Sequence, residues 1–153
     1  MARPPRDPKA PLFGLALVVR GLLQGSVVLA AALAVFLAGV GGRHGEDAAR
    51  GMAFVTLVLG NLVLVMANRS LGSSGFRAAP RPNKALGFVV LVTLLALVLT
   101  IEVPWLRDLF GFARLGAGQI AVSIGAAVAG MAIIESMGAA ARWFRRRDEA
   151  RLL

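Results

Sequence analysis

Few side chains in this 153-residue sequence could do acid–base, nucleophilic or metal chemistry. There is no cysteine, which excludes disulfides, thiolate metal sites and cysteine nucleophiles. The one histidine, His44, has no second histidine with which to share a metal or build a nucleophilic triad. The segment GAGQIA over 116–121 matches a loose dinucleotide fingerprint, but it opens an apolar run and follows no predicted strand. The sequence therefore predicts no catalytic residue, no cofactor site and no firm metal site, and no enzyme activity of this chain on its own.

The remaining candidates are polar groups inside long apolar runs, where ionisable residues often mark functional sites. Glu135 lies seven residues before Arg142, a separation of about 10 Å along a helix. It could therefore pair with a basic neighbour near a membrane surface or act within the membrane. Asn61 and Thr56 share one run and Gln24 lies in another. Such groups either line an ion path or form hydrogen bonds between helices worth about 1 kcal/mol each.

Membrane-spanning helices are the elements that must position these residues. Hydrophobic residues make up 58% of the chain, charged residues 16%, and the mean hydropathy is +0.75, which is too apolar for a soluble domain. Crossing about 30 Å of hydrocarbon takes roughly 17 to 25 helical residues, and only helices satisfy their own backbone in lipid at this chain length. Four runs qualify, at 12–42, 51–68, 85–101 and 115–141. The predicted fold is an all-α membrane protein with four transmembrane helices in a bundle.

The distribution of basic residues predicts the orientation. The N-terminal segment 1–11, the loop 69–84 and the C-terminal tail 142–153 carry twelve of the seventeen basic residues. The loops 43–50 and 102–114 carry four. Because cytoplasmic loops hold the excess of Lys and Arg, both termini are expected in the cytoplasm, and the protein in the cell (plasma) membrane as a multi-pass protein. The formal charge of +9 thus comes mainly from residues expected at the cytoplasmic surface of the membrane, and it does not indicate a nucleic-acid partner.

Further residues are candidates for structural roles at the helices. Arg20 lies within reach of the predicted cytoplasmic surface, where a long basic side chain can extend to water. Small residues at four-residue spacing let helices approach closely. They occur as the pairs Gly21 and Gly25, Gly125 and Ala129, and Ala126 and Gly130.

Several quoted stretches together resemble one family. The opening MARPPRDPKAPL followed by GLLQG resembles the entry to the seventh transmembrane helix of P-type cation-transporting ATPases of the calcium-pump and sodium/potassium-pump type. ARGMAFVTLVLGNLVLVMANRSL resembles their eighth helix, and NKALGFVVLVTLLALVLTIEVPWLRDLFGFARL their ninth helix with its extracytoplasmic loop. IIESMGAAARWFRRR resembles their tenth helix, including its glutamate, here Glu135.

The resemblance implies a membrane module that lacks the catalytic part. The family is phosphorylated on the Asp of a D-K-T-G motif, and none of the four Asp residues here precedes Lys-Thr. ATP and Mg²⁺ are therefore implied only for a missing portion. In calcium pumps an acidic cation ligand lies about eleven positions before the Asn of the N-x-S-L exit. Counting back from Asn68 reaches Leu57, which leaves Asn61, one turn further on, as a weak candidate for a cation path.

We therefore expect a transmembrane support module of such a pump, as a fragment of a truncated or split gene, with the lipid bilayer and the catalytic remainder as partners. By the same resemblance Arg3, Pro4, Pro5 and Arg6 are expected to contact the phosphorylation domain. The alternative is an independent four-helix membrane protein that acts as a homo-oligomeric scaffold or passive channel. The two hypotheses differ in what covers the small-residue faces: helices of a pump or further copies of this chain.

Overall fold

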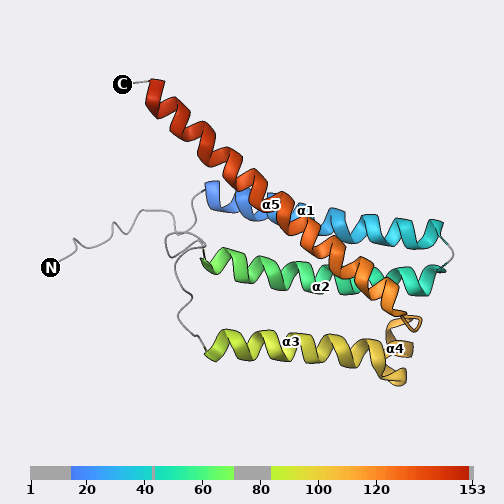
Figure 1. The fold of residues 1–153 in the computed structure, drawn as a ribbon. Helices are drawn as coiled ribbons and strands as arrows, with labels where there is room; N and C mark the ends of the chain where they lie inside the picture. The colour runs from blue at the N-terminus through green and yellow to red at the C-terminus, as the bar shows by residue number, and fades with distance from the viewer. Residues whose placement is uncertain (1–14, 43, 71–83, 152–153) are drawn as a thin grey trace.

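The computed structural model describes residues 15–42, 44–70 and 84–151, and within these ranges all regular secondary structure is helical (Figure 1). The helices are α1 (Leu15–Gly41), α2 (Glu46–Ser70), α3 (Lys84–Glu102), α4 (Pro104–Phe110) and α5 (Ala117–Arg151). Four segments of the described chain are long and apolar enough to cross a membrane: Val18–Gly41, Glu46–Asn68, Lys84–Glu102 and Ala117–Ala140. The predicted all-α membrane fold with four transmembrane helices is confirmed.

The connection between α1 and α2 is shorter than the predicted loop over 43–50. Gly45 takes a positive φ of 79°, a conformation that glycine adopts without strain, and the amide of Ala49 already donates to the Gly45 carbonyl at 3.1 Å. Glu46 and Asp47 occupy the first turn of α2, where carboxylates interact favourably with the exposed amides of the helix N-terminus. The helix therefore begins at Glu46 rather than at Gly51.

The predicted loop over 102–114 contains the short helix α4. Val103 is extended, as expected before proline, and Pro104 opens the helix at a position where its missing N–H is not needed. Gly111 ends the helix at a φ of 64°, where its amide donates to the Asp108 carbonyl at 3.1 Å. Seven residues are too few for a hydrophobic period to show in the sequence, and only the proline and glycine indicate this helix.

The last helix is longer than the predicted span at 115–141. α5 has 35 residues and runs to Arg151, so most of the predicted tail at 142–153 is helical. At 1.5 Å per residue it extends about 52 Å. Figure 1 shows that it crosses obliquely over α1 and α2 and continues beyond them.

The helices are unequally packed. α1, α2 and α5 pack directly against one another, whereas among the described helices α3 contacts only α2 and α4. In the apolar span of α3 11% of residues are buried, compared with 33% in that of α2. The bundle is therefore a packed group of three helices with α3 attached to one side.

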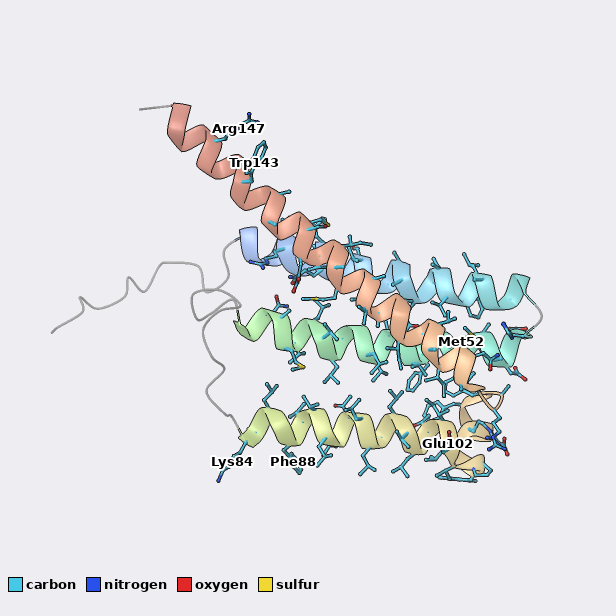
Figure 2. All side chains as sticks on the ribbon, viewed as in Figure 1. Met52, Lys84, Phe88, Glu102, Trp143 and Arg147 are labelled. Atoms are coloured by element: carbon cyan, nitrogen blue, oxygen red, sulfur yellow. The ribbon has the colours of Figure 1, made fainter. Side chains whose placement is uncertain are left out.

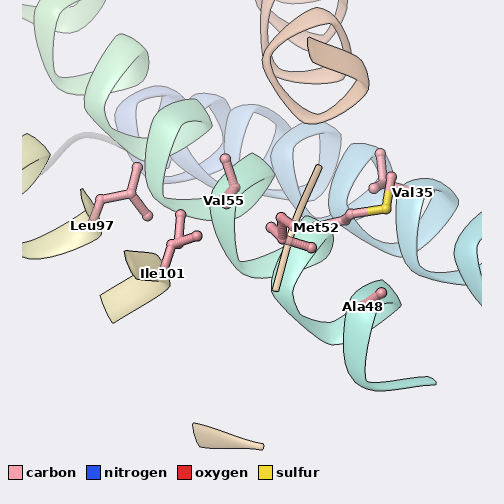
Figure 3. Packing of buried hydrophobic residues seen from close by; sticks show 7 residues of the cluster. Val35, Ala48, Met52, Val55, Leu97 and Ile101 are labelled. Atoms are coloured by element: carbon pink, nitrogen blue, oxygen red, sulfur yellow. The ribbon is translucent and has the colours of Figure 1, made fainter. Parts of the chain in front are cut away.

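The larger buried cluster lies toward one end of this bundle. Figure 3 shows it between α1, α2 and α3. Its members are Val35, Ala48, Met52, Val55, Leu97, Ile101 and Leu115. Leu97 and Ile101 are the buried residues of α3, so this helix is anchored near its C-terminus.

The long helices run between two ends of the bundle, the α4 end and the tail end. The α4 end holds the α1–α2 connection, α4, the end of α3 at Glu102 and the start of α5 at Ala117 (Figures 1 and 2). The tail end holds the start of α1 at Leu15, the end of α2 at Ser70, the start of α3 at Lys84 and the end of α5 at Arg151.

Candidate functional site

The crossing of α5 over α2 contains a buried polar contact. The Thr56 hydroxyl donates to the Met52 carbonyl at 2.9 Å and also faces the Ser123 carbonyl on α5 at 3.3 Å. Ser123 in turn donates to the Gln119 carbonyl at 3.0 Å. Thr56 and Ser123 are both fully buried, so Thr56 joins two helices and does not line an open path.

Glycines bring the packed helices close together. A Cβ on Gly39 of α1 would lie 2.7 Å from the Ala49 Cβ and 3.0 Å from the Ala49 Cα of α2. A Cβ on Gly60 of α2 would lie 2.8 Å from Cγ1 of Val28. These two glycines, which the sequence analysis did not single out, set the distance between α1 and α2. The sequence could have indicated both positions, because a glycine in a membrane helix favours the close approach of a second helix.

The small-residue pairs named from the sequence lie in different surroundings. A Cβ at Gly130 would contact Ala31 of α1 at 3.7 Å, so this member of its pair lies at the α1–α5 interface. A Cβ at Gly21, Gly25 or Gly125 would meet nothing within 4 Å. Three of the predicted close-packing glycines are therefore not covered by the described helices.

Gly21 and Gly25 nevertheless belong to a face of α1 that is covered further along. Alternating steps of four and three residues place Gly21, Gly25, Val28, Ala32, Val35 and Gly39 on one stripe of the helix. From Val28 to Gly39 this stripe is buried, while Gly21 and Gly25 are exposed. We call the exposed part, Gly21 with Gly25, the open glycine face. It lies at the tail end.

Asn61 lies on a second uncovered face. Leu57, Asn61 and Val65 follow one another at four-residue spacing on α2, and all three are exposed. Among the described residues the Asn61 side chain has no hydrogen-bond partner. A carboxamide near the middle of a membrane span thus points away from the helices that pack against α2.

Glu135 and Arg20 are also exposed. Glu135 of α5 forms no ion pair with any described residue, and the Arg142 side chain, its predicted neighbour, lies outside the described residues. Arg20 lies on α1 near the tail end. Arg3, Pro4, Pro5 and Arg6 fall outside the described part of the chain.

The α4 end carries a set of contacts that the sequence did not suggest. The rings of Phe54, Phe110 and Phe112 lie with centroids 5.2 to 6.1 Å apart, a separation at which aromatic pairs attract. The Asp47 carbonyl accepts a hydrogen bond from the Ala113 amide at 3.3 Å, and Arg50 donates to Glu46 at 2.6 Å. The ring contacts and the hydrogen bond from Ala113 to Asp47 join the N-terminal half of α2 to α4 and the segment after it, whereas the pair of Arg50 and Glu46 lies within α2.

No metal centre is formed by the described residues, because no group of three or more His, Cys, Asp or Glu side chains comes together there. His44 is exposed between α1 and α2. The spans of the described chain have some faces that other helices of the chain cover and some faces that none of the described helices covers. The class defined by this architecture is an all-helical, multi-pass membrane domain.

Comparison with known families identifies the family of this membrane domain. The family described as the C-terminus of cation-transporting ATPases matches residues 1–139. The chain belongs to this family, which is the membrane part of these ATPases and not their catalytic domain. No curated protein sequence matches the chain.

Proposed function

We propose that these helices form the transmembrane support module of a P-type cation-transporting ATPase and dock, through their open faces, against helices of the catalytic remainder. The observation that carries this proposal is Asn61 on the uncovered face of α2. Exposing a carboxamide to hydrocarbon without a partner costs several kcal/mol. A face that contains such a group favours contact with protein rather than lipid.

Two further features support a protein partner. The open glycine face continues a stripe that is elsewhere used for helix packing, and small residues at a helix surface favour close approach of a second helix. α3 is mostly exposed along its first two-thirds. A helix of the remainder could therefore lie against the tail end without displacing the contacts described above.

In this proposal the tail end faces the cytoplasm of a cell whose plasma membrane holds the pump. Lys84 and the basic end of α5 lie there, in agreement with the excess of Lys and Arg expected on that side. Arg3 and Arg6 would then reach the phosphorylation domain. The remainder would bind ATP and Mg²⁺ and hydrolyse ATP, while Asn61 would face the cation path.

The first test determines the partner. An antibody against the RRRDEARLL tail is used on native membranes, and the marked protein is captured and identified by mass spectrometry. A band far above 16.0 kDa would place these helices within one long pump chain. A 16.0 kDa band that captures a D-K-T-G-bearing protein would indicate a separate subunit, whereas self-association alone would favour the homo-oligomeric alternative.

A pair of variants then tests the docking face. Gly25→Leu fills the open glycine face, and Ala30→Leu adds similar bulk to an exposed position on the opposite side of α1. We expect Gly25→Leu to lower capture of the catalytic part, or the ATPase activity of the long chain, roughly tenfold through overpacking. Ala30→Leu should change neither. Equal effects of the two variants would contradict docking at this face.

A further inference from the structure

The end of α5 has features that the support role does not explain. Its apolar span ends at Ala140, but the helix continues to Arg151. These eleven additional residues, which we call the tail helix (141–151), extend about 16 Å. Figure 2 shows its labelled residues Trp143 and Arg147 beyond the other helices.

The tail helix is strongly basic where it leaves the membrane. Its sequence holds five arginines, and four of them fall within the six residues 142–147. The two acidic residues, Asp148 and Glu149, come later and thus further from the membrane. Residues 142–147 thus carry four positive charges and no negative charge directly after the apolar span, and the acidic residues begin at 148.

Trp143 and Arg147 show how part of this segment is arranged. Trp143 is 52% exposed, and the guanidinium carbon of Arg147 lies 4.4 Å from the centre of its ring, which is a cation–π contact. Trp143 comes three residues after the end of the apolar span, at the depth where tryptophan is enriched in membrane proteins. The contact holds a guanidinium at the same depth.

We propose that the tail helix binds anionic phospholipid headgroups of the cytoplasmic leaflet. Clusters of four or more basic residues directly after a transmembrane helix attract such lipids, and arginine can bind phosphate oxygens through two parallel hydrogen bonds. The exposed indole and the placement of the arginines before the acidic residues fit a lipid surface better than an acidic protein surface. The proposal requires no catalytic partner and stands or fails separately from the docking of α1 and α2.

The test uses the full chain in nanodiscs. Trp105 is replaced by Phe so that Trp143 is the remaining tryptophan. Its fluorescence is then quenched by brominated phosphatidylglycerol or, at the same mole fraction, by brominated phosphatidylcholine. Enrichment of the anionic lipid at the tail helix should give about twofold stronger quenching by phosphatidylglycerol at low salt, and the difference should shrink at high salt.

Matched variants distinguish an effect of the arginine charges from an effect on folding. Replacing Arg142, Arg145, Arg146 and Arg147 by Gln should abolish the difference between the two lipids, and replacing them by Lys should retain most of it. Arg107→Gln with Arg114→Gln, at the α4 end, should leave it unchanged. Equal quenching by the two lipids in the unmodified tail helix, or a difference that survives the four Gln substitutions, would overturn the proposal.

Discussion

The α4 end and the tail end are made of the same four long helices, yet they are held together very differently. At the α4 end, the buried cluster with Val35 and Met52, the three phenylalanine rings and the short helix α4 tie the elements to one another. At the tail end α5 diverges and α3 is exposed (Figure 1). The α4 end is thus closed by contacts within the chain, whereas the tail end has helix faces that the described helices do not cover.

α1 shows the difference within one helix. Gly39 and Gly25 lie on the same stripe. A Cβ on Gly39 would collide with Ala49 of α2, whereas a Cβ on Gly25 would meet nothing within 4 Å. A small residue thus permits a contact inside the chain at the α4 end, whereas at the tail end it lies on a surface that the described helices do not cover. Gly39→Val, Thr56→Val and Glu46→Gln, the first two each with a control variant, test whether the two ends differ in this way.

The largest effect is expected for Gly39→Val. Its Cβ would meet the Cα and Cβ of Ala49, which cannot rotate away, so α1 and α2 must separate. Overpacking of this kind costs roughly 2 to 3 kcal/mol. Reversible unfolding in mixed detergent micelles, followed by circular dichroism, measures the loss.

Gly25→Val is the matched control for Gly39→Val, because it adds the same group to the same stripe. It should leave the unfolding free energy of the isolated chain unchanged or slightly raised, since valine is a better helix former than glycine. Equal losses for the two variants would show that the α1 stripe is covered along its whole length.

An intermediate effect is expected for Thr56→Val, which removes the hydroxyl that bridges α2 and α5 while keeping the side-chain shape. Hydrogen bonds between membrane helices contribute about 0.6 to 1 kcal/mol, and the same unfolding measurement should show a loss of this size. Thr100→Val is the control, because the Thr100 hydroxyl donates only within its own helix, to the Ala96 carbonyl. A loss for Thr100→Val as large as that for Thr56→Val would contradict a contribution of the α2–α5 bridge to stability.

The smallest effect is expected for Glu46→Gln at the α4 end. The carboxylate pairs with Arg50 one turn later, but both side chains are largely exposed, and solvent-exposed pairs of this kind add little stability. Unfolding free energies at low and high salt should differ little between the variant and the parent chain. A loss as large as that of Thr56→Val would show that the pair of Glu46 and Arg50 contributes substantially to the stability of α2.

The sequence predicted the four long helices because apolar runs of this length have few other structures available in lipid. It did not predict α4, because Pro104 and Gly111 mark only its two ends. Nor did it show that α5 continues past its apolar span. Both were missed because hydropathy reports where a helix crosses the membrane and not where its hydrogen bonding stops.

The candidate site was only partly accessible to sequence reasoning. Asn61 was found because a carboxamide in an apolar run is conspicuous. Gly21 and Gly25 were found by their spacing, but spacing could not show that they are uncovered in this chain, while Gly39 and Gly60 make the close contacts. Which face of a helix meets a neighbour depends on how the helices cross, and a single sequence does not contain that angle.

The unbroken length of α5 has a mechanical consequence. Hydrogen bonding continues without interruption from Ala117 to Arg151, through the crossing with α2 at Ser123 and past the apolar span. The helix stays packed against α1 and α2 as far as Ile134, which is buried with Val28 and Leu64, so it can act as a stiff lever that pivots on this whole crossing region. A slight change of tilt there would be amplified along the part of α5 that extends past these contacts, and the tail helix would sweep sideways along the bilayer surface.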